Sequence, residues 1–135
     1  MSEVEQIAKQ VQRSFEGKAW HGPSVQEVLS GVTAKMAAAP SPGGAHCIWD
    51  IVAHLAAWKA AVARWLTGDR TRPSDAEDWR TITDTSEVAW QRTLNELRAA
   101  HEQLSGEVAK LSDDRLRERL WEGMPSIYTL LHGIV

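Results

Sequence analysis

The side chains in this sequence with the greatest potential for chemistry are five histidines. They are His21, His46, His54, His101 and His132. The chain has no phosphate-binding glycine loop, no Gly-x-Ser-x-Gly, no paired-cysteine zinc motif and no His-Glu-x-x-His. A catalytic metal in a helical bundle is usually held by imidazoles or carboxylates that project inward from different helices. Spacing alone therefore offers His54 and His132 as the two histidines that could meet at a metal.

A structural role is the alternative for each histidine. A lone histidine beside an apolar helix face is more often a hydrogen-bonded core residue than a metal ligand. His101 stands on the apolar face of its helix, which favours a core position. His46 stands where a helix N-cap is expected, and His21 follows a tryptophan in a turn, where it either lines a pocket or is exposed. Asp50, one turn before His54, either orients that imidazole or is a solvated acid at a helix start.

The helix that would position His54 is predicted over residues 48–66. One face carries apolar residues three and four positions apart, namely Ile48, Ile51, Val52, Leu55, Val62 and Leu66. His54 flanks this face and points between Trp58 and Trp65. Most of the remaining surface is alanine, so we expect a central helix surrounded by others. Its three charges exclude a membrane span, because each would cost about 2.5–3.5 kcal/mol near the bilayer centre.

Three further long helices are expected around it. The first follows a capping box at Ser2-x-x-Glu5 and ends at Gly17; another opens at Asp84 with Glu87 and ends before Ser112. The last starts at Pro125-Ser126, and the sequence stops about two and a half turns later. Short helical turns are predicted over residues 24–29 and 33–39, and residues 69–83 are predicted to be a long surface crossover. The sequence therefore predicts an all-α, up-down four-helix bundle in a single domain, residues 1–135.

Composition narrows the function classes. The net charge of −3 gives no basic surface for nucleic acid. The single cysteine, Cys47, excludes an intrachain disulfide and suits a reducing cytoplasm. The first ten residues lack the basic and apolar blocks of a signal peptide. Seven tryptophans are unusual for this length, and we expect them in the core and in pocket walls. A cytoplasmic protein that binds neither nucleic acid nor membrane is expected.

Two stretches resemble the DinB/YfiT-like family: residues 20–24, WHGPS, and residues 44–59, GAHCIWDIVAHLAAWK. Trp79 and the final residues 128–135 fit the same pattern. Members of this family are four-helix proteins often described as metal-dependent hydrolases. The resemblance covers most of the chain and implies the four-helix DinB fold.

The resemblance also implies a divalent metal, commonly nickel or zinc, bound by three histidines. His54 matches the ligand of the central helix. The other two form a His-x-x-x-His pair that would fall past the end of this sequence, whether because the chain is truncated, the record incomplete or the site lost. His132 resembles a residue that precedes the pair and is not itself a family ligand. The chain thus carries one matched ligand of three.

Two hypotheses about function follow. The first is a DinB-like enzyme that acts by metal-assisted hydrolysis or by transfer of a low-molecular-weight thiol, as in mycothiol- or bacillithiol-dependent relatives. His54 would be its metal ligand, and Trp20, His21 and Trp58 would lie near the pocket. The alternative is a non-catalytic, dimerising helical bundle with structural histidines. Homodimers are frequent in the family, and we expect one here. Nothing in the sequence selects the substrate or the metal.

Overall fold

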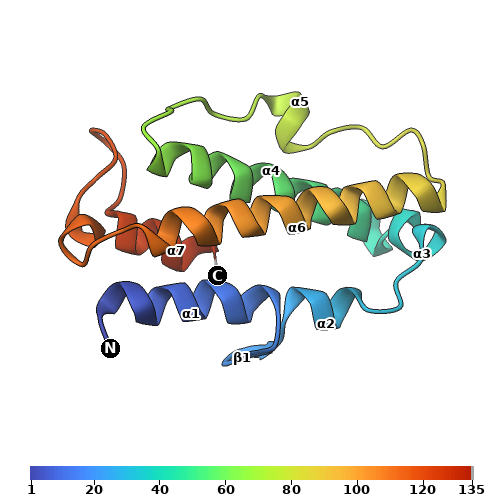
Figure 1. Ribbon diagram of the computed structural model, residues 1–135. Helices are drawn as coiled ribbons and strands as arrows, with labels where there is room; N and C mark the ends of the chain where they lie inside the picture. The colour runs from blue at the N-terminus through green and yellow to red at the C-terminus, as the bar shows by residue number, and fades with distance from the viewer. Residues whose placement is uncertain (135) are drawn as a thin grey trace.

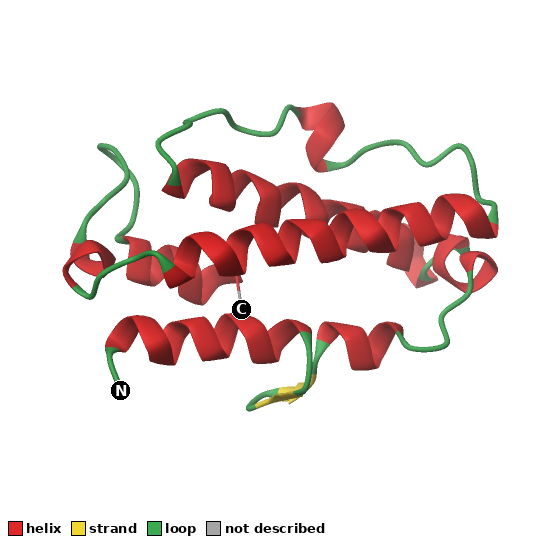
Figure 2. Cartoon of the chain, in the orientation of Figure 1, coloured by secondary structure: helices red, strands yellow, loops and turns green. Residues whose placement is uncertain are grey.

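The long helices lie side by side in a computed structural model that describes residues 1–134 (Figures 1 and 2). The helices are α1 (Glu3–Phe15), α2 (Val25–Leu29), α3 (Ala34–Ala38), α4 (Ile48–Leu66), α5 (Asp75–Asp78), α6 (Glu87–Ala109) and α7 (Ile127–Ile134), with 3-10 turns η1 (Pro42–Gly44) and η2 (Asp114–Arg117). The most extensive contact joins α4 to α6, and α1 packs against α6 and α7. The prediction of an all-α bundle with short helices between the first two long ones is confirmed.

Some local predictions need correction. Residues 69–83 are not a plain loop, because Ser74 caps the single turn α5 within them. A two-residue antiparallel hairpin, β1 (Lys18–Ala19) and β2 (Gly22–Pro23), joins α1 to α2. The N-cap of α6 is Ser86 and not Asp84, which instead accepts a hydrogen bond from the backbone N–H of Ser86 at 3.0 Å. None of the helices within residues 1–134 combines the length and apolarity that crossing a membrane requires.

The buried face of α4 matches the predicted one only in part, since Val52 and Val62 are buried. Ile48 and Ile51 are 38% and 45% exposed, whereas Ala53, Ala56 and Ala63 are buried. Small side chains allow two helix backbones to approach closely, so the alanine face is the one that packs along α6. The large aliphatic side chains of α4 are consequently free to line a cavity.

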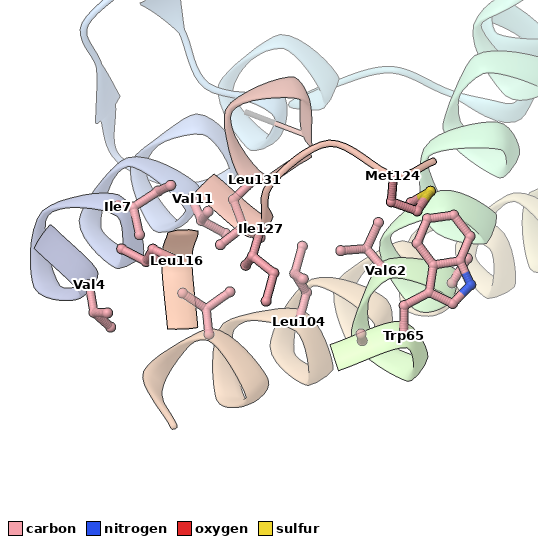
Figure 3. Packing of buried hydrophobic residues seen from close by; sticks show 13 residues of the cluster. Val4, Ile7, Val11, Val62, Trp65, Leu104, Leu116, Met124, Ile127 and Leu131 are labelled. Carbon is pink, nitrogen blue, oxygen red and sulfur yellow. The ribbon is translucent and has the colours of Figure 1, made fainter. Parts of the chain in front are cut away.

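Two clusters of buried apolar side chains hold the bundle together. One gathers at the end formed by α1, α6, η2 and α7, where Leu104, Leu116, Ile127 and Leu131 are completely buried (Figure 3). The other surrounds Trp90 at the opposite end of α6. Because α4 and α6 contribute side chains to both clusters, these two helices connect the packing at the two ends of the bundle.

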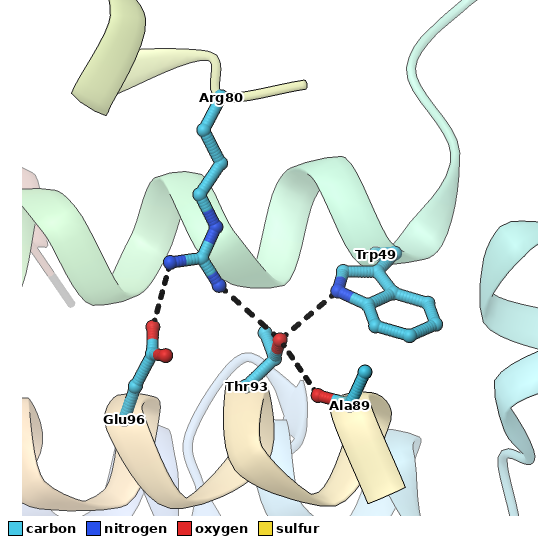
Figure 4. A network of polar contacts seen from close by, with 5 residues as sticks. All are labelled: Trp49, Arg80, Ala89, Thr93 and Glu96. Carbon is cyan, nitrogen blue, oxygen red and sulfur yellow. Dashed lines mark hydrogen bonds and ion pairs between the residues drawn. The ribbon is translucent and has the colours of Figure 1, made fainter. Parts of the chain in front are cut away.

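Hydrogen bonds to Thr93 tie the crossover and α4 to α6 (Figure 4). The buried Trp49 indole donates to Thr93 Oγ1 at 3.0 Å, and Arg80 Nη2 donates to the same oxygen at 3.2 Å. Thr93 itself donates to the Ala89 carbonyl, while Arg80 pairs with Glu96 at 2.8 Å. The buried indole N–H is thereby satisfied, which is the condition for placing tryptophan in a core.

Candidate functional site

An Asp–His pair joins the central helix to the crossover. His54 projects from α4, and its Nδ1 lies 2.6 Å from Oδ1 of Asp78, the last residue of α5. The same carboxylate oxygen accepts a hydrogen bond from the Trp58 indole at 2.6 Å. A carboxylate can only accept, so Nδ1 of His54 carries the proton and donates it. The lone pair of a neutral His54 is therefore on Nε2, which is free to accept a proton or to bind a metal.

Aromatic stacking further restricts the His54 ring. The Trp79 indole lies between two imidazoles, with ring centroids 4.0 Å from His54 and 3.7 Å from His46, and both pairs are nearly parallel. Asp50 lies at the edge of this arrangement, with its Oδ2 3.8 Å from Nδ1 of His46. Its carboxylate accepts from the Cys47 backbone N–H at 3.1 Å, so it belongs to the capping box of α4, whose N-cap is Cys47 and not His46.

His54 lies in the wall of a cavity of about 910 Å³. The wall comes from α2, α4 and α7 and from the β-hairpin and C-terminal half of α1, and it is predominantly apolar. Ile51 and Leu55 of α4, Val28 of α2 and Leu130 of α7 are typical contributors. The few polar side chains in this wall include His54, His21 and Lys59. An apolar cavity of this size with a few convergent polar groups is typical of a small-molecule site.

The predicted pocket residues take different positions. Trp58 and His21 line the cavity. Trp20 is 82% exposed, and its indole contacts the His21 ring edge-on at 5.4 Å, so it lies beside a wall residue. His132 packs against Tyr128 and lines a different cavity, formed by α1, η2 and α7. The structure therefore does not bring His132 and His54 to one cavity.

A three-ligand metal site does not fit the described side chains. Within residues 1–134, no group of three or more His, Cys, Asp or Glu side chains is arranged to hold a metal ion. His54 has the orientation of a metal ligand, because its Nδ1 lies 2.6 Å from Asp78 and metal-binding histidines commonly donate their other ring N–H to a carboxylate. The donor set in this part of the chain thus amounts to one oriented imidazole.

A second polar cluster lies beside the cavity. Lys59 of α4 is 2% exposed, and its Nζ lies 3.4 Å from Nδ1 of His101 on α6. The His101 ring stacks on Phe15 at 4.1 Å, and its Nε2 lies 3.4 Å from the Ser105 hydroxyl. Burial lowers the pKa of Lys59 to about 8, and burial together with the Lys59 charge lowers the pKa of His101 to about 4. His101 is therefore neutral near pH 7 and accepts a hydrogen bond from Lys59.

Sequence reasoning missed Asp78 and Lys59. Asp78 lies 24 residues from His54 in a polar segment, and nothing in the spacing pairs the two. Lys59 carried a signal, since it is a charged residue on a helix that is otherwise almost wholly apolar or alanine. A charged side chain at such a position is either exposed to solvent or buried among other groups, and the Lys59 side chain is buried.

Comparison with known proteins gives one result on this fold and site. A family model for the DinB superfamily matches residues 20–134, which include β2, α4, the crossover and α7. Comparison with curated proteins and with solved structures finds no match. The family model covers well over half of the chain, including His54, Asp78 and Trp79. The protein therefore belongs to the DinB superfamily.

Proposed function

We propose that the protein binds an apolar or amphiphilic small molecule in the cavity beside His54. The observation that carries the proposal is the cavity itself, about 910 Å³ with a mainly apolar wall, into which one oriented imidazole is built. Its volume lies in the range of roughly 300–1,000 Å³ that is usual for ligand sites. Burying the ligand's apolar part supplies affinity at about 25 cal/mol per Å², and the polar groups set its orientation.

The His54–Asp78 pair indicates what chemistry this site would support. With Nδ1 committed to Asp78, Nε2 can accept a proton from a ligand group placed within hydrogen-bonding distance. Metal-dependent hydrolysis and transfer of a low-molecular-weight thiol, which the DinB resemblance implies, both require a water or a thiol to lose a proton. We assign this step to His54 in a site where its Nε2 holds no metal, because the single lone pair on Nε2 either accepts a proton or binds a metal.

Binding of the dye 1-anilinonaphthalene-8-sulfonate and its displacement by 1-octanol test the cavity. Ile51→Glu places a charge in the apolar wall at a residue that is 45% exposed, so folding should survive. We expect this variant to weaken dye binding at least about tenfold, the loss of roughly 1.4 kcal/mol. Val88→Glu is the matched control, because Val88 is 70% exposed and outside the cavity wall. Equal affinity in the two variants, or no saturable binding by the parent, would contradict the proposal.

Binding of a divalent ion, nickel or zinc, is the second candidate function. The Asp78–His54 bond favours it, since a carboxylate behind the imidazole is the usual support of a metal-bound histidine. His54 would supply one ligand, and residues 1–134 do not supply a full set. The test is the metal content of the purified protein beside His54→Ala and the control His46→Ala. Near-stoichiometric metal that only His54→Ala removes supports the assignment; a parent that stays empty after incubation with either ion refutes it.

The alternative function, a non-catalytic dimerising bundle, also makes a clear prediction. It requires a homodimer that forms with or without a cavity ligand, and analytical ultracentrifugation measures this directly. A dimer without saturable ligand or metal binding favours this alternative. A homodimer together with ligand binding agrees with the family expectation and leaves the cavity proposal in place.

A further inference from the structure

The amine of Lys59 is unusual among the charged groups of the described residues, because it is buried without a carboxylate partner. Among the ion pairs formed within residues 1–134, none includes Lys59. Its hydrogen-bond partner is the His101 imidazole at 3.4 Å, and the Phe15 ring lies 5.5 Å from Nζ. A fully buried ammonium is costly unless it is paired, and here the partner is an imidazole and an aromatic face.

Lys59 also lies at the cavity wall. It is one of the residues that line the apolar cavity, together with Ser14, Val62 and Trp65. A lysine desolvated in an apolar pocket is the arrangement that proteins use to make an amine nucleophilic. We propose that Lys59 binds an amphiphilic aldehyde in this cavity covalently, as an imine on Nζ. This inference rests on the proposed function, since it assigns a chemical class to the ligand of the same cavity.

Imine formation needs only the Lys59 amine and the aldehyde as reactants. The neutral amine of Lys59 attacks the carbonyl carbon, a C–N bond forms, and a proton moves from nitrogen to oxygen to give a carbinolamine. Loss of water then breaks the C–O bond and leaves the C=N bond of the imine. No oxidant or reductant takes part. His101, as a neutral acceptor for the amine, orients Nζ and carries no positive charge that would repel the protonated imine.

The lowered pKa of Lys59 supports imine formation, because the reaction requires the neutral amine. With a pKa of about 8, roughly one Lys59 side chain in ten is a neutral amine at pH 7, against fewer than about one in a thousand for an ordinary exposed lysine. The titratable groups around it are His101 on α6, Glu16 at the end of α1, and His21 and His54 in the cavity wall. Burial alone lowers the pKa of Lys59 to about 8, close enough to neutral pH for an imine to form there.

Reductive trapping tests the proposal on the intact protein. The protein is incubated with octanal near neutral pH, reduced with sodium borohydride and mapped by peptide mass spectrometry. Lys9, Lys18, Lys35 and Lys110 are exposed and serve as internal standards, as does the α-amino group of Met1. We expect Lys59 to carry at least about tenfold more adduct than any exposed lysine, given its larger neutral fraction. Octanol should compete with labelling of Lys59 and leave Met1 unchanged.

Two outcomes separate this inference from the function on which it rests. If octanol displaces the dye from the cavity and Lys59 carries no more adduct than the exposed lysines, the imine is refuted and the binding proposal stands. If neither octanol nor octanal competes with the dye, both proposals fail. Lys59→Met, which keeps the length of the side chain, should abolish the selective adduct, whereas Lys35→Met, at an exposed lysine outside the cavity wall, should change neither the adduct on Lys59 nor dye binding.

Discussion

At the scale of single residues, the cost of burying Lys59 should be measurable in stability. Burial lowers the pKa of Lys59 from 10.5 to about 8, so the folded protein releases this proton before the unfolded chain does. Between these pH values the unfolded state holds more protons, and the free energy of unfolding therefore rises with pH. Lys59→Met removes this penalty, so it should stabilise the protein by up to about 3 kcal/mol near pH 7.

The quantity to measure is the difference in the free energy of unfolding between the parent and Lys59→Met. Urea unfolding of the parent and of Lys59→Met should give a gap that is largest below about pH 8 and shrinks as the pH approaches 10.5. Lys35→Met is the control, since Lys35 is exposed on α3. A gap that does not change with pH would show that the Lys59 amine is not desolvated in the folded protein.

His101 affects stability in the same direction as Lys59 but at a lower pH. Burial, and then the Lys59 charge, lower its pKa from 6.5 to about 4, so the unfolded chain binds a proton in this interval that the folded protein rejects. Stability should therefore fall as the pH drops from about 6.5 to 4, by up to about 3 kcal/mol from this residue. In urea titrations His101→Gln should remove this part of the acid loss, and His21→Gln, at an exposed histidine, should retain it.

At the scale of elements, α5 is held in place by its last residue. Asp78 accepts hydrogen bonds from His54 and Trp58 of α4, each at 2.6 Å. Asp78→Ala leaves both N–H groups without this acceptor, so we expect a loss of about 1–3 kcal/mol and faster amide hydrogen exchange in residues 74–80. Asp75→Ala, at the exposed start of the same turn, is the matched control. Unchanged exchange in Asp78→Ala would mean that the stacked Trp79 holds the crossover by itself.

The same elements explain what the sequence could predict. Helices α1, α4 and α6 are long, periodic and bounded by caps or glycines, and such signals are local. The helical turn α5 has four residues and each strand of the β-hairpin has two, so neither is long enough to show a periodic pattern in the sequence. His54 can be identified from the sequence as a candidate, because it is a histidine in a largely apolar helix. Its partner Asp78 cannot be, because a contact across 24 residues depends on how the crossover packs. For the same reason the predicted apolar face of α4, which rightly includes Val52 and Val62, also includes the exposed Ile48 and Ile51 and omits the buried alanines.

At the scale of the whole molecule, the two core clusters should unfold together. The cluster around Leu104 and the cluster around Trp90 share α4 and α6, so neither end can lose its packing while these helices remain whole. Leu131 of α7 is completely buried in the first cluster. Leu131→Ala should therefore lower the free energy of unfolding by about 2–5 kcal/mol and still give a single transition.

Two probes that report on different levels of structure check this cooperativity. Far-ultraviolet circular dichroism follows all helices, and tryptophan fluorescence follows side-chain packing in both clusters, through Trp65 in the first and Trp49 and Trp90 in the second. The two urea midpoints should coincide in the parent and in Leu131→Ala, and both should shift by the same amount. His132→Ala, at the exposed neighbour of Leu131, should change the free energy of unfolding by less than about 0.5 kcal/mol by either probe. Separate midpoints in Leu131→Ala would mean that α7 docks as an independent unit, and the cavity wall that it contributes would then open before the bundle unfolds.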